Sequence, residues 1–262
     1  MKPLAELEPE TVHDLTGIFF DLDDTFLTHG RLERETYNAL WDLHDAGFRL
    51  VAVTGRPSGW AEVFVRNWPI DGAVTENGAV FVVRNGKGID VLTDPGFADR
   101  RARLDSLIES VRAAMPDLTL SDDVHARRSD VTWDIGERVV VPEDRITALA
   151  RLVVAAGART TRSTVHLHAS FERDDKASGA IRFVRERFGE DPGTAIVRWA
   201  FLGDSPNDAA CFAALRTTFG VANVRPFASK MSVPPRWIAS AERGAGFAEI
   251  ARALLAGRTD RR

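Results

Sequence analysis

The sequence has almost no cysteine, since Cys211 is the only one in 262 residues. A disulfide framework within the chain is therefore excluded, and such low cysteine use is typical of a reducing cytoplasm. The sequence also lacks a run of about 18 consecutive apolar residues, the length that a membrane-spanning helix needs. Residues 1–14 are acidic and contain no apolar stretch of signal-peptide length. We therefore expect a cytoplasmic protein without a membrane partner.

An excess of positive charge is missing as well. The chain has 34 Lys and Arg against 38 Asp and Glu, which gives a net charge of −4. This balance provides no basic surface that would indicate nucleic acid or acidic lipid as a partner. The hydrophobic fraction of 44% and the charged fraction of 27% are typical of a globular protein. The sequence leaves open whether the protein is a monomer or a homodimer.

Three short apolar runs near the start of the chain resemble buried strands: residues 17–20, 49–53 and 72–75. Their apolar residues follow one another without alternation, as in strands covered on both faces of a parallel sheet. Helical patterns over about 32–46 and 58–68 separate the runs. This order predicts right-handed βαβ units in a doubly wound sheet.

The pattern changes at about residue 84. Two helical patterns, over about 104–115 and 143–156, are each followed by a strand in which apolar and polar residues alternate. Two such units predict a small α+β domain with an open, mostly antiparallel sheet. We place this domain at residues 84–173.

The strand–helix order of the first segment returns after Asp175. The predicted elements are a helix over 177–188, a strand over 197–202, a helix over 208–215 and a strand over 217–222. The predicted fold class is therefore α/β, with a doubly wound, mostly parallel Rossmann-like core and an inserted α+β domain. The core comprises residues 1–83 and 174–262.

Polar residues follow the predicted core strands, and one lysine precedes the helix at which the core resumes. They are Asp21, Asp23, Thr54, Gly55, Lys176, Asp204 and Asp208. In open α/β sheets the carboxyl ends of the strands form the ligand site. The carboxylates, the hydroxyl and the cation are together suited to binding a phosphate through a metal ion.

These residues resemble, in order, the four motifs of the haloacid dehalogenase superfamily of phosphotransferases. The matching segments are Phe19-Phe20-Asp21-Leu22-Asp23-Asp24-Thr25, Val53-Thr54-Gly55-Arg56, Lys176 and Gly203-Asp204-Ser205-Pro206-Asn207-Asp208. The resemblance covers essentially the whole chain and implies that residues 84–173 form a type II cap domain.

One further segment indicates which subgroup of the superfamily the chain resembles. Glu76-Asn77-Gly78-Ala79 is similar to subgroup IIB, which includes sugar-phosphate phosphatases and phosphomannomutases. Residues 203–208 are similar to those of mannosyl-3-phosphoglycerate phosphatases.

The resemblance also implies a role for each motif residue. Asp21 would attack phosphorus and form an aspartyl phosphate, while Asp23 would protonate the leaving alkoxide and then deprotonate the attacking water. Thr54 and Lys176 would bind phosphate oxygens. Mg²⁺ would be the cofactor, and its ligands would be Asp21, the backbone carbonyl of Asp23, and Asp204. Asp208 would hold a metal-bound water or position Lys176.

A second group of polar residues contains candidates for substrate binding: Gly55, Arg56, Asn77, His166, His168 and Asn207. Arg56 could reach a phosphate or sugar group, or it could form an ion pair. Asn77 could orient the nucleophile loop or cap a turn with Gly78. His166 and His168 share one face of an alternating strand, and that face either contacts the leaving group or is solvated.

The predicted function is a Mg²⁺-dependent phosphomonoesterase that acts on a small phosphorylated metabolite, a sugar phosphate or phosphorylated glycoside. One alternative is a phosphosugar mutase, which returns the phosphoryl group to the sugar. Another is a non-catalytic protein that binds sugar phosphates. The intact set of Asp21, Asp23 and Lys176 argues against the second alternative, because binding alone does not require an acid/base at Asp23.

Overall fold

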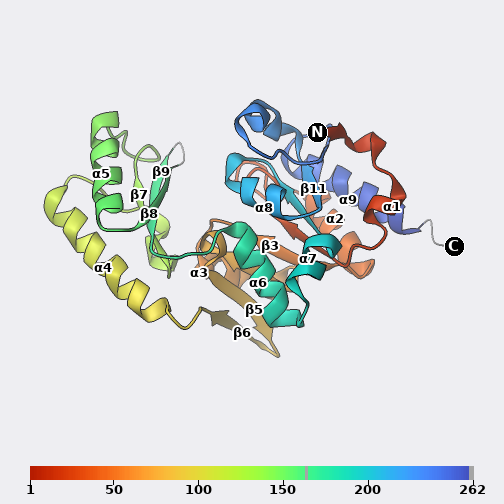
Figure 1. The fold of residues 1–262 in the computed structure, drawn as a ribbon, viewed down its shortest axis with the longest axis horizontal. Coiled ribbons are helices and arrows are strands. Elements are labelled where there is room, and N and C mark those ends of the chain that lie inside the picture. The colour runs from red at the N-terminus through yellow and green to blue at the C-terminus, as the bar shows by residue number, and fades with distance from the viewer. Residues whose placement is uncertain (163–164, 260–262) are drawn as a thin grey trace.

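The computed structural model describes residues 1–162 and 165–259. Figure 1 shows two lobes, a larger core that holds both chain ends and a smaller unit beside it. Two connections join the lobes, one before residue 97 and one after residue 170. We call residues 97–170 the small domain.

The core is built on a nine-stranded sheet in the order β1-β12-β11-β10-β2-β3-β4-β5-β6. All its pairings are parallel except the two that involve β5. The strands are β1 (Lys2–Pro3), β2 (Gly17–Phe20), β3 (Arg49–Val53), β4 (Gly72–Thr75), β5 (Val80–Asn85), β6 (Gly88–Leu92), β10 (Trp199–Gly203), β11 (Thr217–Gly220) and β12 (Trp237–Ile238).

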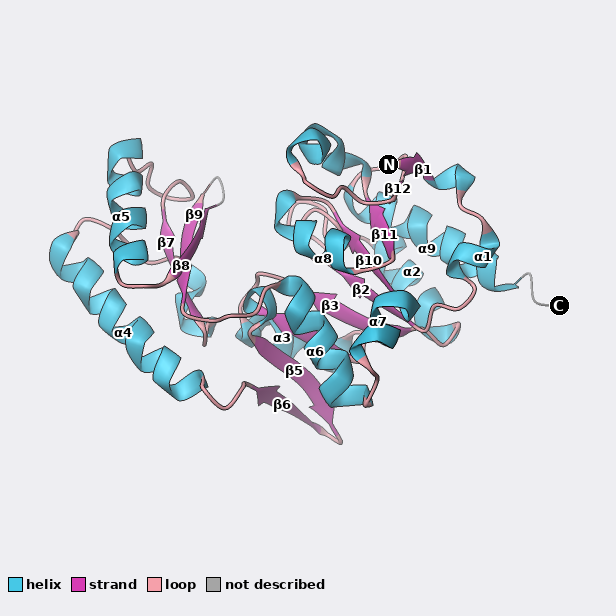
Figure 2. Cartoon of the chain, viewed as in Figure 1, coloured by secondary structure: helices cyan, strands magenta, loops and turns pink. Residues whose placement is uncertain are grey.

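Helices cover both faces of this sheet (Figure 2). They are α1 (Pro9–Val12), α2 (Arg34–Asp45), α3 (Ser58–Asn67), α6 (Lys176–Phe188), α7 (Pro192–Arg198), α8 (Ala209–Ala214) and α9 (Arg243–Thr259). Strand β2 contributes to both layers: Ile18 and Phe20 pack with α2, α3 and α9, and Phe19 packs with α6, α7 and α8. Burial on both faces explains why β2 consists of consecutive apolar residues.

The small domain has its own sheet and its own apolar core. Its antiparallel strands lie in the order β7-β9-β8, with bounds β7 (Asp130–Asp134), β8 (Arg159–Arg162) and β9 (His166–Ser170). Helices α4 (Phe97–Ala114) and α5 (Glu143–Ala155) pack on one face through buried residues such as Leu107 and Leu149. The predicted fold class, a mostly parallel α/β core with an inserted α+β domain, is confirmed.

The predicted boundary at residue 84 lies inside a strand of the core. Strands β5 and β6 form an antiparallel hairpin that extends the core sheet to Leu92. Arg84 fastens the hairpin to α3, because its guanidinium donates hydrogen bonds to the carbonyl of Val65. β6 is a partly exposed edge strand without a clear alternation, so its sequence does not mark it as core.

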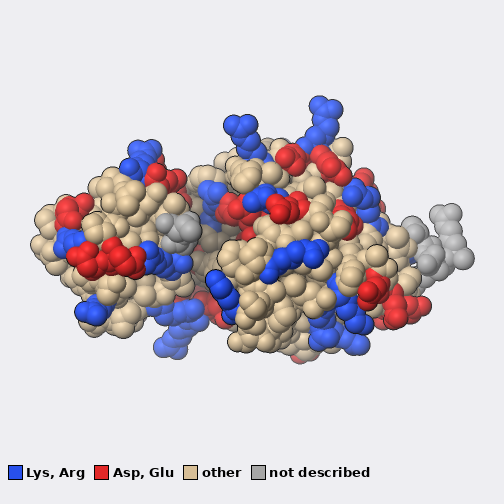
Figure 3. All heavy atoms as spheres, turned by 90° about the horizontal axis from the view of Figure 1, so that it is seen from above, with Lys and Arg blue, Asp and Glu red and all other residues tan. Residues whose placement is uncertain are grey.

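The sequence patterns did not predict two helices of the core, α7 and α9. Residue 197, predicted in a strand, lies in α7, and β10 begins at Trp199. The long C-terminal helix α9 was not predicted, although its Phe247 and Leu254 are fully buried. Within residues 1–162 and 165–259, no helix is both long and apolar enough to cross a membrane. Seen from above, basic and acidic side chains lie interspersed over both lobes (Figure 3).

The start of helix α6 is fixed by a close contact with the turn after β4. A methyl group added at Gly179 would lie 2.4 Å from the Cα atom of Gly78. Both partners are backbone, so neither can move aside easily. We expect Gly179→Ala to lower the free energy of unfolding by about 1–3 kcal/mol, the usual cost of overpacking, as measured by urea denaturation.

The matched control is Gly193→Ala in α7, where the added methyl would meet only the flexible side-chain end of Asp191 at 3.0 Å. Alanine is the better helix former by up to about 1 kcal/mol, so this variant should be as stable as the wild type or more so. Equal stabilities of the two variants would contradict the close-contact explanation.

Candidate active site

Three buried carboxylates meet where two neighbouring core strands end. Asp21 follows β2 directly, Asp204 follows β10, and Asp208 lies one short turn further on. Each offers an oxygen within 4.8 Å of the others. The three residues are only 5%, 7% and 0% exposed, respectively. The parallel pairing of β2 with β10 thus brings together residues more than 180 positions apart in the sequence.

Lys176 neutralises part of this charge. Its Nζ atom lies 2.6 Å from Asp21 Oδ1 and 2.8 Å from Asp208 Oδ1. The lysine is the first residue of α6, and Asp175 caps that helix by accepting a hydrogen bond from the backbone N–H of Ser178. Burial opposes the charged form, but Asp208 and Asp21 outweigh it and raise the pKa of Lys176. The ammonium group is therefore firmly charged.

One lysine does not balance three carboxylates. Burial raises the pKa of Asp21 well above its ordinary value, although Lys176 acts in the opposite direction. Burial and the neighbouring Asp208 raise the pKa of Asp204 to about 7. The cluster thus carries more negative charge than its surroundings compensate, and its donor atoms are all oxygens. Such a set fits Mg²⁺, a hard cation that prefers carboxylate and water ligands.

Asp204 is oriented by two further residues. Thr25 Oγ1 donates to Asp204 Oδ1 at 3.3 Å, and Asn223 Nδ2 donates to Asp204 Oδ2 at 3.0 Å. Asn223 also donates to the backbone carbonyl of Asp24 at 3.0 Å, so it ties the loop after β2 to the loop after β11. Sequence reasoning missed Asn223 because its segment carries no motif.

Asp23 lies at the edge of the cluster and is paired with Arg56. The Nε and Nη2 atoms of Arg56 donate to the two Asp23 oxygens at 2.7 and 2.5 Å. The guanidinium group also stacks over the ring of Trp60, 4.3 Å from its centroid. The sequence left open whether Arg56 contacts a phosphate or sugar group or forms an ion pair, and in the structure it forms an ion pair. The side chain of Asp23 is 45% exposed, so a substrate can reach it.

The loop after β3 carries Thr54 and Gly55. Thr54 is fully buried, and its hydroxyl accepts a hydrogen bond from the backbone N–H of Arg56 at 3.1 Å. Asn77, on the adjacent turn, accepts a hydrogen bond from Asn207 Nδ2 at 3.2 Å. This bond joins the turn after β4 to the loop after β10, so Asn77 helps to hold the site loops together.

Glu76, beside Asn77, fastens the small domain to the core. Its buried carboxylate accepts hydrogen bonds from the backbone N–H groups of Ser58, Arg128 and Ser129 and from the Ser129 hydroxyl, at 2.6–3.1 Å. Burial, followed by the nearby Asp130, raises the pKa of Glu76. The sequence pointed to Glu76 only as part of a family motif, since its partners Arg128 and Ser129 come from the other domain.

A cleft of about 80 Å³ lies between the two domains. Lys176 and Asn207 line it from the core, and His168 and Asp130 line it from the small domain. His166, on the same strand as His168, does not line the cleft and contacts Glu137 at 2.8 Å. The two histidines share one face, as the sequence predicted, with ring centroids 6.1 Å apart, but only His168 lines the cleft.

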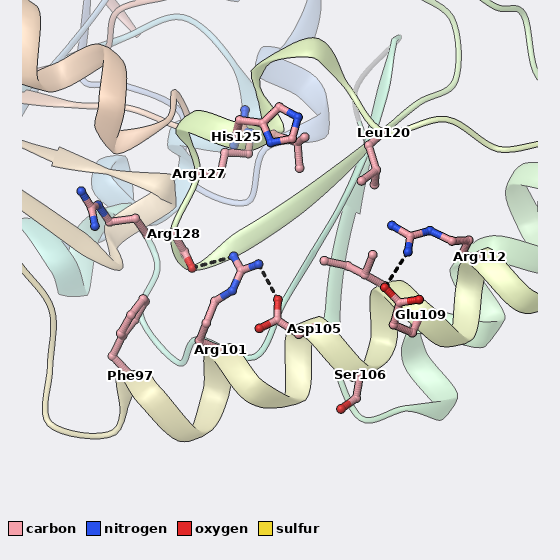
Figure 4. A pocket seen from close by; sticks show the side chains of 12 residues that line it. Phe97, Arg101, Asp105, Ser106, Glu109, Arg112, Leu120, His125, Arg127 and Arg128 are labelled. Atoms are coloured by element: carbon pink, nitrogen blue, oxygen red, sulfur yellow. Dashed lines mark hydrogen bonds and ion pairs between the residues drawn. The ribbon is translucent and has the colours of Figure 1, made fainter.

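A second hollow, of about 740 Å³, lies in the small domain between α4 and residues 120–128 (Figure 4). Arg101 contacts Asp105 and the carbonyl of Arg128, and Arg112 contacts Glu109. Asp21, Lys176 and Asp204 do not line this hollow. Its charged side chains are paired, either within the hollow or with Asp123, Asp130 and Glu62 beside it, and it provides none of the candidate catalytic groups.

A family model described as haloacid dehalogenase-like hydrolase matches residues 18–93. The matched segment is thus similar to haloacid dehalogenase-like hydrolases and includes Asp21, Asp23, Thr54 and Arg56. A search of curated proteins gives no match.

Solved structures with the same fold cover nearly the whole chain. A Thermoplasma acidophilum protein has a TM-score of 0.69 and 12% identity, over 92% of this chain and 98% of its own. The sucrose-phosphatase of Synechocystis has a TM-score of 0.65 and 15% identity, over 92% and 98%. A sugar phosphatase of HAD subclass IIB has a TM-score of 0.60 and 16% identity, over 94% and 99%.

The raised pKa of Asp204 predicts a specific dependence of stability on pH. A carboxyl group whose pKa rises on folding stabilises the fold when protonated, and this contribution is lost as pH rises through the folded pKa. For Asp204 the loss falls between about pH 4 and pH 7. The metal-free protein should therefore melt several degrees lower at pH 8 than at pH 5, and added Mg²⁺ should restore stability at pH 8.

Asp204→Asn is the comparison for this measurement, because an amide does not titrate. Its melting temperature should fall less between pH 5 and pH 8, and Mg²⁺ should raise it less. A wild-type and a variant protein with the same slope against pH would contradict the assignment.

The contacts of Glu76 predict a second effect. Glu76→Gln leaves one acceptor oxygen for four donors and places an NH₂ group against them. We expect a loss of about 2–3 kcal/mol in the free energy of unfolding, measured in urea, since bonds to charged groups are strong and buried donors are costly to leave unpaired. Glu62→Gln is the control, because Glu62 meets Arg128 only in an exposed pair at 3.4 Å. Such pairs contribute about 0–1 kcal/mol, so equal losses would argue against the role given to Glu76.

Proposed function

We propose that this protein is a Mg²⁺-dependent phosphomonoesterase of the cytoplasm that acts on a small phosphorylated metabolite. The observation that carries the proposal is the buried cluster of Asp21, Asp204 and Asp208 around Lys176. The sugar phosphatases that share the fold support a sugar phosphate or phosphorylated glycoside as the substrate. The small domain, in this proposal, is the cap of the enzyme.

Asp21 is the proposed nucleophile. One of its carboxylate oxygens bonds to phosphorus as the bond between phosphorus and the leaving-group oxygen breaks, which gives an aspartyl phosphate. Water then attacks phosphorus, inorganic phosphate leaves, and the Asp21 carboxylate is regenerated. Lys176, 2.6 Å from Asp21, fixes the carboxylate and offsets the charge of the incoming phosphate. Thr54, at the end of the next strand, binds a phosphate oxygen.

Asp23 is the proposed acid and base. It gives a proton to the departing alkoxide and takes one from the attacking water. Because Asp23 is paired with Arg56, its carboxylate must be protonated and must leave Arg56 before it donates to the substrate. The exposed side chain of Asp23 is free to make this movement.

The metal would be held by Asp21, Asp204 and the backbone carbonyl of Asp23, with Asp208 beside them. When bound, Mg²⁺ would supply positive charge that offsets the repulsion between the carboxylates and the incoming phosphate. Asp208 also accepts hydrogen bonds from the backbone N–H groups of Asp204 and Ser205, at 2.9 and 3.3 Å. Asp208 therefore shapes the loop that presents Asp204.

The test is phosphate release from a panel of phosphorylated metabolites, with Mg²⁺ and with a chelator. We expect release only with Mg²⁺, and Asp21→Asn should lower kcat by at least about 1,000-fold, because an amide is not a nucleophile. Asp24→Asn is the matched control. Asp24 lies on the same loop but pairs with Arg243 at 2.9 Å, so this variant should retain most activity. Activity of Asp21→Asn close to that of the wild type would refute the proposal.

A further inference from the structure

Arg127 is a buried arginine of the small domain that reaches across to the core. Its side chain is only 3% exposed, and its Nη1 atom donates a hydrogen bond to the backbone carbonyl of Gly55 at 3.2 Å. The segment before it packs closely on the core, since a methyl group added at Gly59 would lie 3.0 Å from the Cβ atom of Ala126. The contact between Arg127 and the loop after β3 is therefore part of the docked junction between the domains.

Two aspartates of the small domain hold the guanidinium group in this position. Asp130 accepts from Nη1 at 3.0 Å on each of its oxygens, and Asp123 accepts from Nε and Nη2 at 3.0 and 2.8 Å. Burial opposes the charged form, but Asp130 and Asp123 outweigh it and raise the pKa of Arg127. Nη1 carries two hydrogens, so it can bind Asp130 and Gly55 at the same time. The donor that meets the Gly55 carbonyl is therefore charged and fixed in direction.

The peptide unit that Arg127 contacts is also bonded to Thr54. Its carbonyl belongs to Gly55 and accepts from Arg127, while its N–H belongs to Arg56 and donates to Thr54 Oγ1 at 3.1 Å. A glycine restrains its neighbouring peptide units less than other residues do, because it lacks a Cβ atom. A bond at each end of this peptide replaces the missing restraint. Arg127 thus fixes the orientation of the N–H group that donates to Thr54.

That N–H group determines what the Thr54 hydroxyl can do. A hydroxyl has one hydrogen to donate and lone pairs with which to accept. The bond from Arg56 occupies a lone pair, and among residues 1–162 and 165–259 no acceptor is found for the hydrogen. The hydrogen is therefore available to an oxygen of a bound phosphate. In a flipped peptide the Gly55 carbonyl would face the hydroxyl and take this hydrogen instead.

We propose that Arg127 is a positioning residue through which the docked small domain orients Thr54 for phosphate binding. The inference rests on the proposed phosphatase function and gives the small domain a part in phosphate binding that is separate from any contact with the leaving group. Arg127 does not touch the phosphate in this proposal and acts through the peptide between Gly55 and Arg56. Loss of Arg127 should therefore affect every phosphate ester, whatever its leaving group.

The test is a double-mutant cycle between Arg127→Met and Thr54→Val, measured on the full chain with Mg²⁺ and phenyl phosphate. Methionine keeps much of the length of the arginine side chain without its donors, and valine replaces the threonine hydroxyl by a methyl group. The leaving group of phenyl phosphate carries no further polar group, so its turnover reports on the phosphate site. Binding of inorganic phosphate to each variant, measured by calorimetry with Mg²⁺, gives a second readout without turnover.

We expect Arg127→Met to lower kcat/KM by about tenfold or more and to weaken phosphate binding by a similar factor, because a bond from a charged donor is lost. Thr54→Val should have an effect at least as large. In the Thr54→Val background, Arg127→Met should lower kcat/KM by less than about threefold, since the hydroxyl that Arg127 orients is already absent. Such non-additivity indicates that both residues act through one group.

Arg128→Gln is the matched control. Arg128 is the next residue and its side chain also crosses to the core, but only in an exposed pair with Glu62 at 3.4 Å. Exposed pairs contribute little, so this variant should stay within about twofold of the wild type in both readouts.

Arg127→Met/Asp130→Asn is measured in the same cycle, because it removes the guanidinium group together with its buried partner. Asp123, the other partner, is 17% exposed and keeps its bond from Ser121 Oγ at 2.7 Å. No buried carboxylate is then left unpaired, so this variant takes the place of Arg127→Met if the single variant does not fold. The same loss and the same non-additivity with Thr54→Val are expected.

The outcomes separate this inference from the proposed function. Equal losses on removal of Arg127 in the wild-type and the Thr54→Val backgrounds indicate only a structural role, which overturns the inference and leaves the phosphatase function intact. Unchanged phosphate binding after removal of Arg127 overturns the inference as well. Absence of Mg²⁺-dependent phosphate release by the wild type, from phenyl phosphate and from every phosphorylated metabolite of the panel, overturns both.

Discussion

The contact of Lys176 with Asp21 and Asp208 determines much of what surrounds it. A buried ammonium group is stable only when opposite charges lie close to it, and here two carboxylates do so at 2.6 and 2.8 Å. To make both contacts, helix α6 has to begin at this point, between the ends of β2 and β10. The close contact between Gly179 and Gly78 allows the start of α6 to lie there. The remaining negative charge, on Asp204 above all, is what suits the cluster to a cation.

The two domains contribute different residues to the candidate site. Every member of the charged cluster comes from the core, where rigid parallel strands fix the positions of the carboxylates. The small domain adds no charge to the cluster. It contributes His168 and Asp130 to one wall of the cleft, opposite Lys176. In the proposed function, the groups that carry out bond cleavage therefore all belong to the core.

Much of the core and of the cluster could be predicted because local sequence marks both. Consecutive apolar residues identify β2, β3 and β4, and a polar residue after such a run identifies the ligand edge of the sheet, as at Asp21. Lys176 and Asp204 follow from motif order. The β5–β6 hairpin was not recognised as core, because an edge strand covered on one side has a weak pattern.

Residues whose roles depend on contacts between domains could not be predicted in this way. Arg127 and Glu76 are charged residues with no local sign of burial, and each is buried where it contacts the other domain. The two histidines illustrate the same point. Alternation places His166 and His168 on one face, but only the packing of the domains decides which of them lines the cleft.

The attachment through Glu76 has a consequence for how such an enzyme can change. Two of the partners of Glu76 in the small domain are backbone N–H groups, at Arg128 and Ser129, and every residue other than proline supplies such a group. These two bonds make no demand on the side chains of the small domain, whereas the Ser129 hydroxyl and the Arg127 guanidinium, which donates to the Gly55 carbonyl, do. Cleft residues outside these contacts can change while the domain stays docked.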